Sequence, residues 1–422
     1  MLALIRSSFP RRAEFLWLMG LAFFLPLFEA PKNICWIAYV LTWTYNRREA
    51  GSWGGPWDRW DTLIALWIAS GYVVATFSGV HQDEWREAND LLRYGSILLL
   101  VKRSRFGEIE LLSILATVIG ATLLTLAWGY WRVFVSGSGH EVGLHSVGHV
   151  NHSAIYMTIV FGTALSLTIF YWRRMGLATK TAMSLAVLAL VVSVFITGSR
   201  AAAGAAVLFL LALGGTALAR RHHLARNGVF AALIGVAVVF AVNPRVINKT
   251  ISQSDEGLVL SYRDKIWANG LVEWRAFPLF GVGMGNFGKV RLGELERWNA
   301  AQSWSIRASP QGMWPHAHSL YVNTLAERGL FGFGVLLIVI LAWGGALIRA
   351  VPKVDDPPIA WTIFGAALAG WLTTVAVGVV NTTLHHENAI LSVLLFGLCL
   401  GSPPHEPQRS PISSDDANIK LS

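Results

Sequence analysis

Long apolar stretches constrain this chain more than any other feature. A helix that crosses a bilayer needs ~20 mostly apolar residues, and about twelve stretches approach that length. They cover residues 13–30, 33–46, 61–80, 89–101, 108–131, 150–171, 179–197, 200–219, 228–243, 329–349, 359–380 and 386–402. Only 14% of the 422 residues are charged, whereas a soluble domain carries ~25%. The sequence therefore predicts an all-α polytopic membrane protein with about 12 transmembrane helices.

Basic residues predict how these helices are oriented. Arg and Lys gather before the first apolar stretch and after every second one, at Arg6, Arg11, Arg12, Arg47, Arg48, Arg59, Lys102, Arg103, Arg105, Arg173, Arg174, Lys180, Arg220, Arg221, Arg226, Arg349 and Lys353. Basic loops stay in the cytoplasm of bacterial inner-membrane proteins, so both termini are predicted to be cytoplasmic. The same rule explains the net charge of +9, and no nucleic-acid partner is expected.

This topology divides the chain into four parts. The predicted parts are transmembrane helices at 1–243, a large periplasmic loop at 244–317, transmembrane helices at 318–402 and a disordered cytoplasmic tail at 403–422. The loop is rich in arginine, which an anionic ligand would explain. Within it, Arg263, Trp267, Gly270 and Trp274 have the spacing of one helical face.

Glycines follow that predicted helix. The run from Gly283 to Gly288 formally matches GxGxxG, the pattern of dinucleotide-binding turns. No predicted strand precedes it and no βαβ unit follows. We therefore interpret it as a tight turn.

Histidines mark the outer membrane boundary. The run Pro315-His-Ala-His318-Ser319 is predicted to open a helix after Pro315 that continues into the membrane. The ordinary pKa of His318 suits proton abstraction near neutrality, although a lone histidine can also serve packing. On a helix, His316 would point away from His318. His140, His145, His149 and His152 form a second group, which has no complete metal-ligand set; His386 is expected to line a cavity.

An arginine opens another predicted helix. Ser199 is placed to cap this helix, which puts Arg200 in its first turn. A helix N-terminus favours anions, and arginine adds a bidentate fork for phosphate. The alternative is an arginine that snorkels to the interface beside closely packed helices.

Three of these patterns together resemble the O-antigen ligase family, within the superfamily of O-antigen ligases and polymerases. The resemblance rests on His318-Ser319 followed after nine residues by Gly329-Leu-Phe-Gly332, on Ser199-Arg200, and on Arg263 ahead of Pro278–Gly283. Phe333 departs from the family pattern, which usually has Gly, Thr or Tyr there. The resemblance implies a GT-C-like membrane fold with one large extracytoplasmic loop.

The resemblance also implies a reaction and its participants. O-antigen would pass from undecaprenyl diphosphate to a sugar of lipid A–core oligosaccharide on the periplasmic side, among membrane lipids. His318 would be the base of an inverting transfer without metal or cofactor, and Arg200 and Arg263 would bind the diphosphate. The residues expected to support them are Ser199, Tyr262, Trp267, His316, Ser319 and His386.

Other functions stay open at this point. An O-antigen or exopolysaccharide polymerase would use the same donor, and so would a protein O-oligosaccharyltransferase. A transporter of polyisoprenoid-linked glycans is an alternative from another class. It would favour charges at mid-membrane depth, where Arg93 is the clearest example, and broken helices at matching positions in two halves.

Overall fold

The computed structural model describes residues 2–139, 141–242, 262–301, 306 and 308–402. All regular secondary structure within these residues is helical, which confirms the predicted class. The helices are α1 (Leu2–Phe24), α2 (Glu29–Glu49), α3 (Arg59–Phe77), α4 (Glu84–Ser104), α5 (Glu108–Tyr130), α6 (Val150–Tyr171), α7 (Leu177–Ile196), α8 (Arg200–Ala219), α9 (His223–Val242), α11 (Arg263–Ala276), α12 (Leu292–Ala300), α13 (Leu320–Arg349), α14 (Pro358–Leu372) and α15 (His386–Gly401). Short π-helical turns, Trp131–Val135 and Thr373–Val377, extend α5 and α14.

Each predicted apolar stretch coincides with a helix, and the chain is an integral membrane protein. Among the described residues, 8 helices are long and apolar enough to cross a bilayer. Two shorter apolar helices, Ala13–Phe24 and His386–Gly401, accompany them. Polar and charged residues interrupt α2 and α4, so the number of twelve spans stays a prediction. The predicted tail 403–422 and residues 244–261, 302–305 and 307 of the predicted loop lie outside the described residues.

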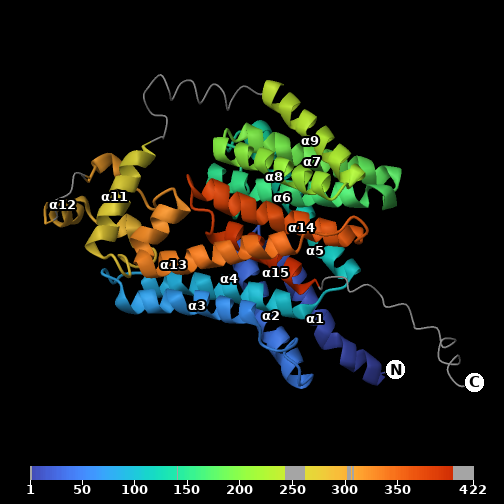
Figure 1. Ribbon diagram of the computed structural model, residues 1–422, viewed down its shortest axis with the longest axis horizontal. Coiled ribbons are helices and arrows are strands. Elements are labelled where there is room, and N and C mark those ends of the chain that lie inside the picture. Colours follow the sequence, from blue (N-terminus) through green and yellow to red (C-terminus); the bar gives the residue numbers. More distant parts are fainter. Residues whose placement is uncertain (1, 140, 243–261, 302–305, 307, 403–422) are drawn as a thin grey trace, which may run out of the picture.

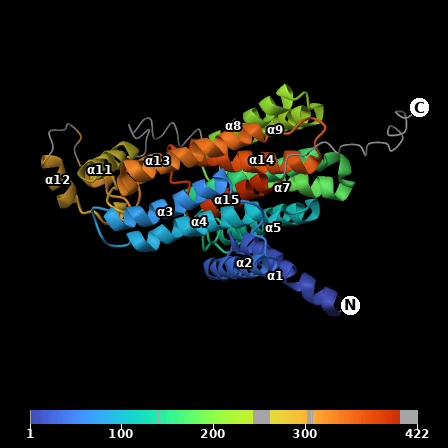
Figure 2. The same ribbon diagram turned by 60° about the horizontal axis from the view of Figure 1, so that its bottom comes forward.

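The long helices form one bundle around α6. α6 is buried throughout its apolar window and packs against α14, α7 and α8. α1 and α2 lie along one side of the bundle, and α8 and α9 lie along the other (Figures 1 and 2). α11 and α12 lie at the end of the bundle opposite the N-terminus (Figure 1).

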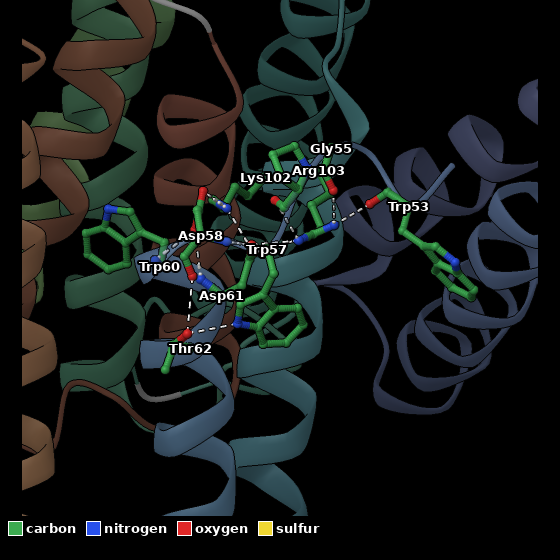
Figure 3. A network of polar contacts seen from close by, with 10 residues as sticks. Trp53, Gly55, Trp57, Asp58, Trp60, Asp61, Thr62, Lys102 and Arg103 are labelled. Carbon is green, nitrogen blue, oxygen red and sulfur yellow. Dashed lines mark hydrogen bonds and ion pairs between the residues drawn. The ribbon is translucent and has the colours of Figure 1, made fainter. Parts of the chain in front are cut away.

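A charged network joins the start of α3 to the end of α4 (Figure 3). Asp61 is fully buried and accepts two hydrogen bonds from Arg103, at 2.6 and 3.1 Å, and one from Lys102 at 2.8 Å. Arg103 also donates to the backbone carbonyls of Trp53 and Gly55, so it fixes the loop before α3. A buried carboxylate is tolerable here because cations surround it.

A second buried ion pair was missed at the sequence level. Lys32 on α2 binds Glu387 at the start of α15, and both side chains are almost fully buried. Ser146 donates a further hydrogen bond to Glu387 at 3.1 Å. Arg93, the predicted mid-depth charge, lies near Asp90 at 3.6 Å. These partners lie far apart in sequence, except for Arg93 and Asp90, so no local pattern reveals them.

α13 is broken at Gly329, where φ is 59° and ψ is −164°. The break frees backbone groups that a continuous helix would pair internally. The turn after α11 supplies their partners, because the N–H groups of Leu330 and Phe331 donate to the carbonyls of Pro278 and Leu279 at 2.8 and 3.0 Å.

The same turn pairs with α13 on the other side of the break. The N–H groups of Val282 and Gly283 donate to the carbonyls of Ala326 and Glu327, each at 2.9 Å. A Cβ on Gly281 would lie 2.4 Å from the carbonyl carbon of Glu327, so only glycine fits. We call this interlocked pair of segments, 278–283 and 326–331, the Gly329 joint. It fixes α11 and its turn on α13.

Candidate active site

The segment before α13 is not helical. α13 begins at Leu320, and Ser319 is its N-cap, whose side chain accepts a hydrogen bond from Val322 N–H. The prediction of a helix directly after Pro315 is therefore wrong by a few residues. His318 has a φ of 46°, in the left-handed region that non-glycine residues rarely adopt. Such a conformation persists only where neighbouring contacts fix it.

Those contacts hold Ala317, the residue between the two histidines. Its N–H donates to Asn323 Oδ1 at 2.9 Å, and its carbonyl accepts from Trp267 Nε1 at 3.1 Å. Asn323 Nδ2 in turn donates to Glu327 Oε2 at 2.9 Å. The fixed peptide places the rings of His316 and His318 with their centroids 4.4 Å apart. The helical spacing expected for His316 and His318 does not apply, because the segment does not follow a helical path.

His318 lies in a partly buried, positively charged environment. Its ring meets Trp314 edge to face, and its Nδ1 is buried without a hydrogen-bond partner among the described residues. Burial lowers the pKa of His318 to about 3, and positive charge at His316 and Arg263 adds to the shift. The imidazole is therefore neutral at physiological pH, with its lone pair available to accept a proton.

Two helices place arginines near this histidine. Arg200 is the first residue of α8, and Arg263 is the first residue of α11. The Arg263 Nε donates to the carbonyl of Val380 at 2.9 Å. Burial and the nearby charge of Arg200 lower the pKa of Arg263. Arg263, at the N-terminus of α11, thus lies within electrostatic reach of both Arg200, at the N-terminus of α8, and His318.

The residues predicted to support this centre differ in their contacts. Ser199 is the N-cap of α8, but its side chain makes no capping hydrogen bond. Tyr262 is the N-cap of α11 with a φ of 62°, and Ser319 Oγ donates to the Gly378 carbonyl at 3.4 Å. Trp267 donates a hydrogen bond to the carbonyl of Ala317, as described above. His386 and His316 line a cavity that Arg200, Arg263 and His318 do not line.

An apolar cavity of about 430 Å³ lies beside Arg200. Its walls come from α7, α8 and α9, and Arg200 supplies their charge. The lining residues are Phe195, Arg200, Ala203, Gly204, Val207, Leu233, Val236, Ala237 and Phe240. An apolar wall that ends at a guanidinium suits a molecule with a hydrocarbon chain and an anionic head.

Sequence reasoning missed the polar residues that hold the histidine segment. Asn323 and Glu327 follow His318 in the same stretch, and their roles depend on the fold of 315–319. Glu273 on α11 is buried, and its pKa is raised well above the ordinary value by burial and by Glu327. Burial therefore favours the uncharged form of Glu273.

One member of the second histidine group, His152, also lies near the candidate active site. The ring of His152 lies 5.9 Å from the rings of both His316 and His385. Within the described part of the chain, no three His, Cys, Asp or Glu side chains are arranged to hold a metal ion. His140 lies outside the described residues.

Residues 185–337 match the family model described as O-antigen ligase. The match covers just over a third of the chain and includes Arg200, Arg263, His318 and Gly329. The resemblance stated from the sequence motifs is confirmed over this segment. No curated protein matches the chain.

Proposed function

Because residues 185–337 carry the O-antigen ligase domain, we propose that the protein transfers O-antigen from undecaprenyl diphosphate to a sugar hydroxyl of lipid A–core oligosaccharide. One observation carries this proposal: Arg263 lies within electrostatic reach of both Arg200 and a neutral His318, and Arg200 lines an apolar cavity. In the proposed complex the polyisoprenoid chain occupies that cavity, and its diphosphate meets the two guanidinium groups.

Each residue has a defined task in the proposed transfer. The acceptor hydroxyl attacks the anomeric carbon of the donor sugar while the bond from that carbon to the diphosphate oxygen breaks. His318 takes the hydroxyl proton, and the configuration at the anomeric carbon inverts. Negative charge grows on the leaving diphosphate, where Arg200 and Arg263 stabilise it. Undecaprenyl diphosphate departs as the second product.

The bound donor also improves the proposed base. In the free protein, burial and positive neighbours favour the neutral form of His318. The diphosphate offsets the charge of Arg200 and Arg263, so the pKa of His318 rises when donor binds. A higher pKa makes the imidazole a stronger base at the moment when the acceptor hydroxyl must lose its proton.

The proposed location is the bacterial inner membrane, with both termini in the cytoplasm and this centre facing the periplasm. The basic clusters support this orientation. Reporter fusions after Lys102, Arg174 and Arg221 should be cytoplasmic, and a fusion near Glu256 should be periplasmic. Fusions at Arg221 and Glu256 that report the same side would contradict the orientation.

Reconstitution tests the reaction directly. The purified full-length protein is incubated with lipid-linked O-antigen and lipid A–core, with and without a metal chelator. We expect lipopolysaccharide of higher mass in both samples. Growth of the lipid-linked glycan without lipid A–core would instead indicate a polymerase. Loss of transfer with chelator, restored by a divalent cation, would contradict the metal-free mechanism.

A further inference from the structure

A second cavity of about 350 Å³ adjoins His316. α3, α4, α13, the turn at Met284 and the segment before α15 form its walls. Arg200, Arg263 and His318 do not line it, so it is separate from the proposed diphosphate site. Its volume lies at the lower end of the ~300–1,000 Å³ range of small-molecule sites. Arg86, whose side chain is exposed, lines it and marks where the cavity reaches the surface.

The charges around this cavity differ from those of the diphosphate site. Two guanidinium groups line it, and so do three carboxyl groups, those of Glu87, Asp90 and Glu327. Arg86 is already paired with Glu87 at 3.0 Å. An anion placed here would lie beside the Glu87 carboxylate, with which Arg86 is already paired, and like charge opposes its binding. A sugar without charge fits better, because each hydroxyl can donate to a carboxylate and accept from a guanidinium.

Buried polar atoms of the lining residues still lack partners. Arg328 is 5% exposed and donates from Nη2 to Ser70 Oγ at 2.7 Å, but its Nε has no partner among the described residues. Thr382 Oγ1 and His316 Nε2 are likewise unpartnered within the described chain. A buried polar group without a hydrogen bond costs ~1–3 kcal/mol, so these atoms favour a ligand that carries hydroxyls.

We propose that this cavity binds the acceptor sugar and that it selects a sugar without phosphate or carboxylate groups. The inference rests on the proposed transferase function. His316 connects the two sites, since it lines this cavity and its ring centroid lies 4.4 Å from that of His318. A sugar in the cavity would therefore be separated from the proposed base, His318, by the ring of His316.

Two neighbouring threonines give a matched test. Thr382 lines the cavity with an unpartnered hydroxyl, whereas the Thr383 hydroxyl donates to the Thr374 carbonyl at 2.7 Å and does not line it. Transfer is measured with lipid-linked O-antigen and with two acceptors: lipid A–core that ends in a neutral hexose, and the same molecule phosphorylated on that hexose. Thr382→Val should raise KM for the neutral acceptor about five- to tenfold, as loss of one sugar hydrogen bond predicts, with KM for the donor unchanged. Thr383→Val should change neither KM.

Cavity filling provides a second variant if Thr382→Val does not fold. Leu384→Trp places a larger side chain on the cavity wall and should raise the acceptor KM alone. The wild-type protein should use the phosphorylated acceptor at least about tenfold more slowly, which corresponds to a like-charge penalty of ~1.4 kcal/mol.

The outcomes separate this inference from the function on which it rests. If the wild-type protein transfers O-antigen but Thr382→Val and Leu384→Trp leave the acceptor KM unchanged, the cavity assignment is wrong and the proposed function stands. Equal use of both acceptors would overturn the selection against charge. If the wild-type protein transfers to neither acceptor, the proposed function is wrong, and the acceptor assignment is wrong with it.

Discussion

Asn323 accepts a hydrogen bond from the backbone N–H of Ala317 at 2.9 Å, and this contact fixes the peptide between the two histidines. Replacing Asn323 with Leu removes the acceptor and leaves the N–H unpaired. We expect His318 to lose its orientation and the rate to fall by about 10²-fold, as a small misplacement of a reacting group can cause. The measurement is kcat per folded molecule, with KM for the donor expected to change little. A large rise in donor KM at normal kcat would argue against this positioning role.

His318 and His316 should have separable effects. His318→Ala should fold and insert normally but lose about 10²–10⁴-fold in kcat, the usual contribution of a general base. His316→Ala should be milder in kcat and should raise the KM for acceptor, because His316 lines the second cavity. Both rates are normalised to folded protein. A normalised rate for His318→Ala within a few-fold of wild type would exclude it as the base.

The pH dependence should differ between free and donor-bound protein. The pKa of His318 is lowered to about 3, so the base form is present above that pH and is lost only as the pH falls through it. The acidic limb of kcat/KM, which reports the free protein, should therefore lie well below the ordinary histidine pKa of ~6.5. The limb of kcat should lie at higher pH, because bound diphosphate raises the pKa of His318.

Rates from pH ~4 to 9 test this difference: the kcat/KM profile should show no acidic limb in this range, whereas the kcat profile should show one. Protein held at each pH and returned to neutrality serves as the control for acid damage. An acidic limb at the same pH in the kcat/KM and kcat profiles would mean that the charge of the bound donor does not change the pKa of His318.

Arg200 and Arg263 should not tolerate lysine. An ammonium group cannot reproduce the bidentate fork, and losing a contact to a buried anion costs ~2–5 kcal/mol in comparable interfaces. Arg200→Lys and Arg263→Lys should therefore each lose much activity. Arg297 on α12 is exposed, and Arg297→Lys is the matched control that should retain it. Near-normal transfer in both Arg200→Lys and Arg263→Lys would remove them from the diphosphate site.

Two glycines on α8 test the proposed lipid cavity. A Cβ added to Gly204 or to Gly215 meets no atom within 4 Å, so both positions have open space for the first atom of a side chain. Gly204 lines the apolar cavity and Gly215 does not. Gly204→Leu should raise KM for the lipid-linked donor, whereas Gly215→Leu should behave like wild type. Equal donor KM in the two variants would mean that the hydrocarbon chain lies elsewhere.

The sequence predicted the helices better than the contacts between them. Apolar length is a local property, so stretches such as 150–171 and 200–219 coincide with α6 and α8. The helix start before Leu320 was placed too early, because the hydrogen bonds that hold Ala317 come from Trp267 and Asn323 rather than from helical neighbours. Those partners become visible only once the chain has folded.

For the candidate site, too, the sequence predicted individual residues but not the contacts between them. Arg200, Arg263 and His318 were singled out by residue type and by the family resemblance, but no spacing in the sequence brings them together. The cavity beside His316 was not predicted, because its walls come from segments as far apart as Trp67 and Thr382. Lys32 and Glu387 were missed for the same reason.

The Gly329 joint has a consequence for protein engineering. Its two halves share their backbone hydrogen bonds, so neither the turn 278–283 nor the broken helix is complete without the other. A fragment cut between residues 283 and 326 would leave the N–H groups of Leu330 and Phe331 and the carbonyls of Pro278 and Leu279 without their partners. Chimeras that exchange the outer segment between related proteins should therefore carry residues 263–331 as one unit, since a graft that ends before α13 separates the two segments of the Gly329 joint.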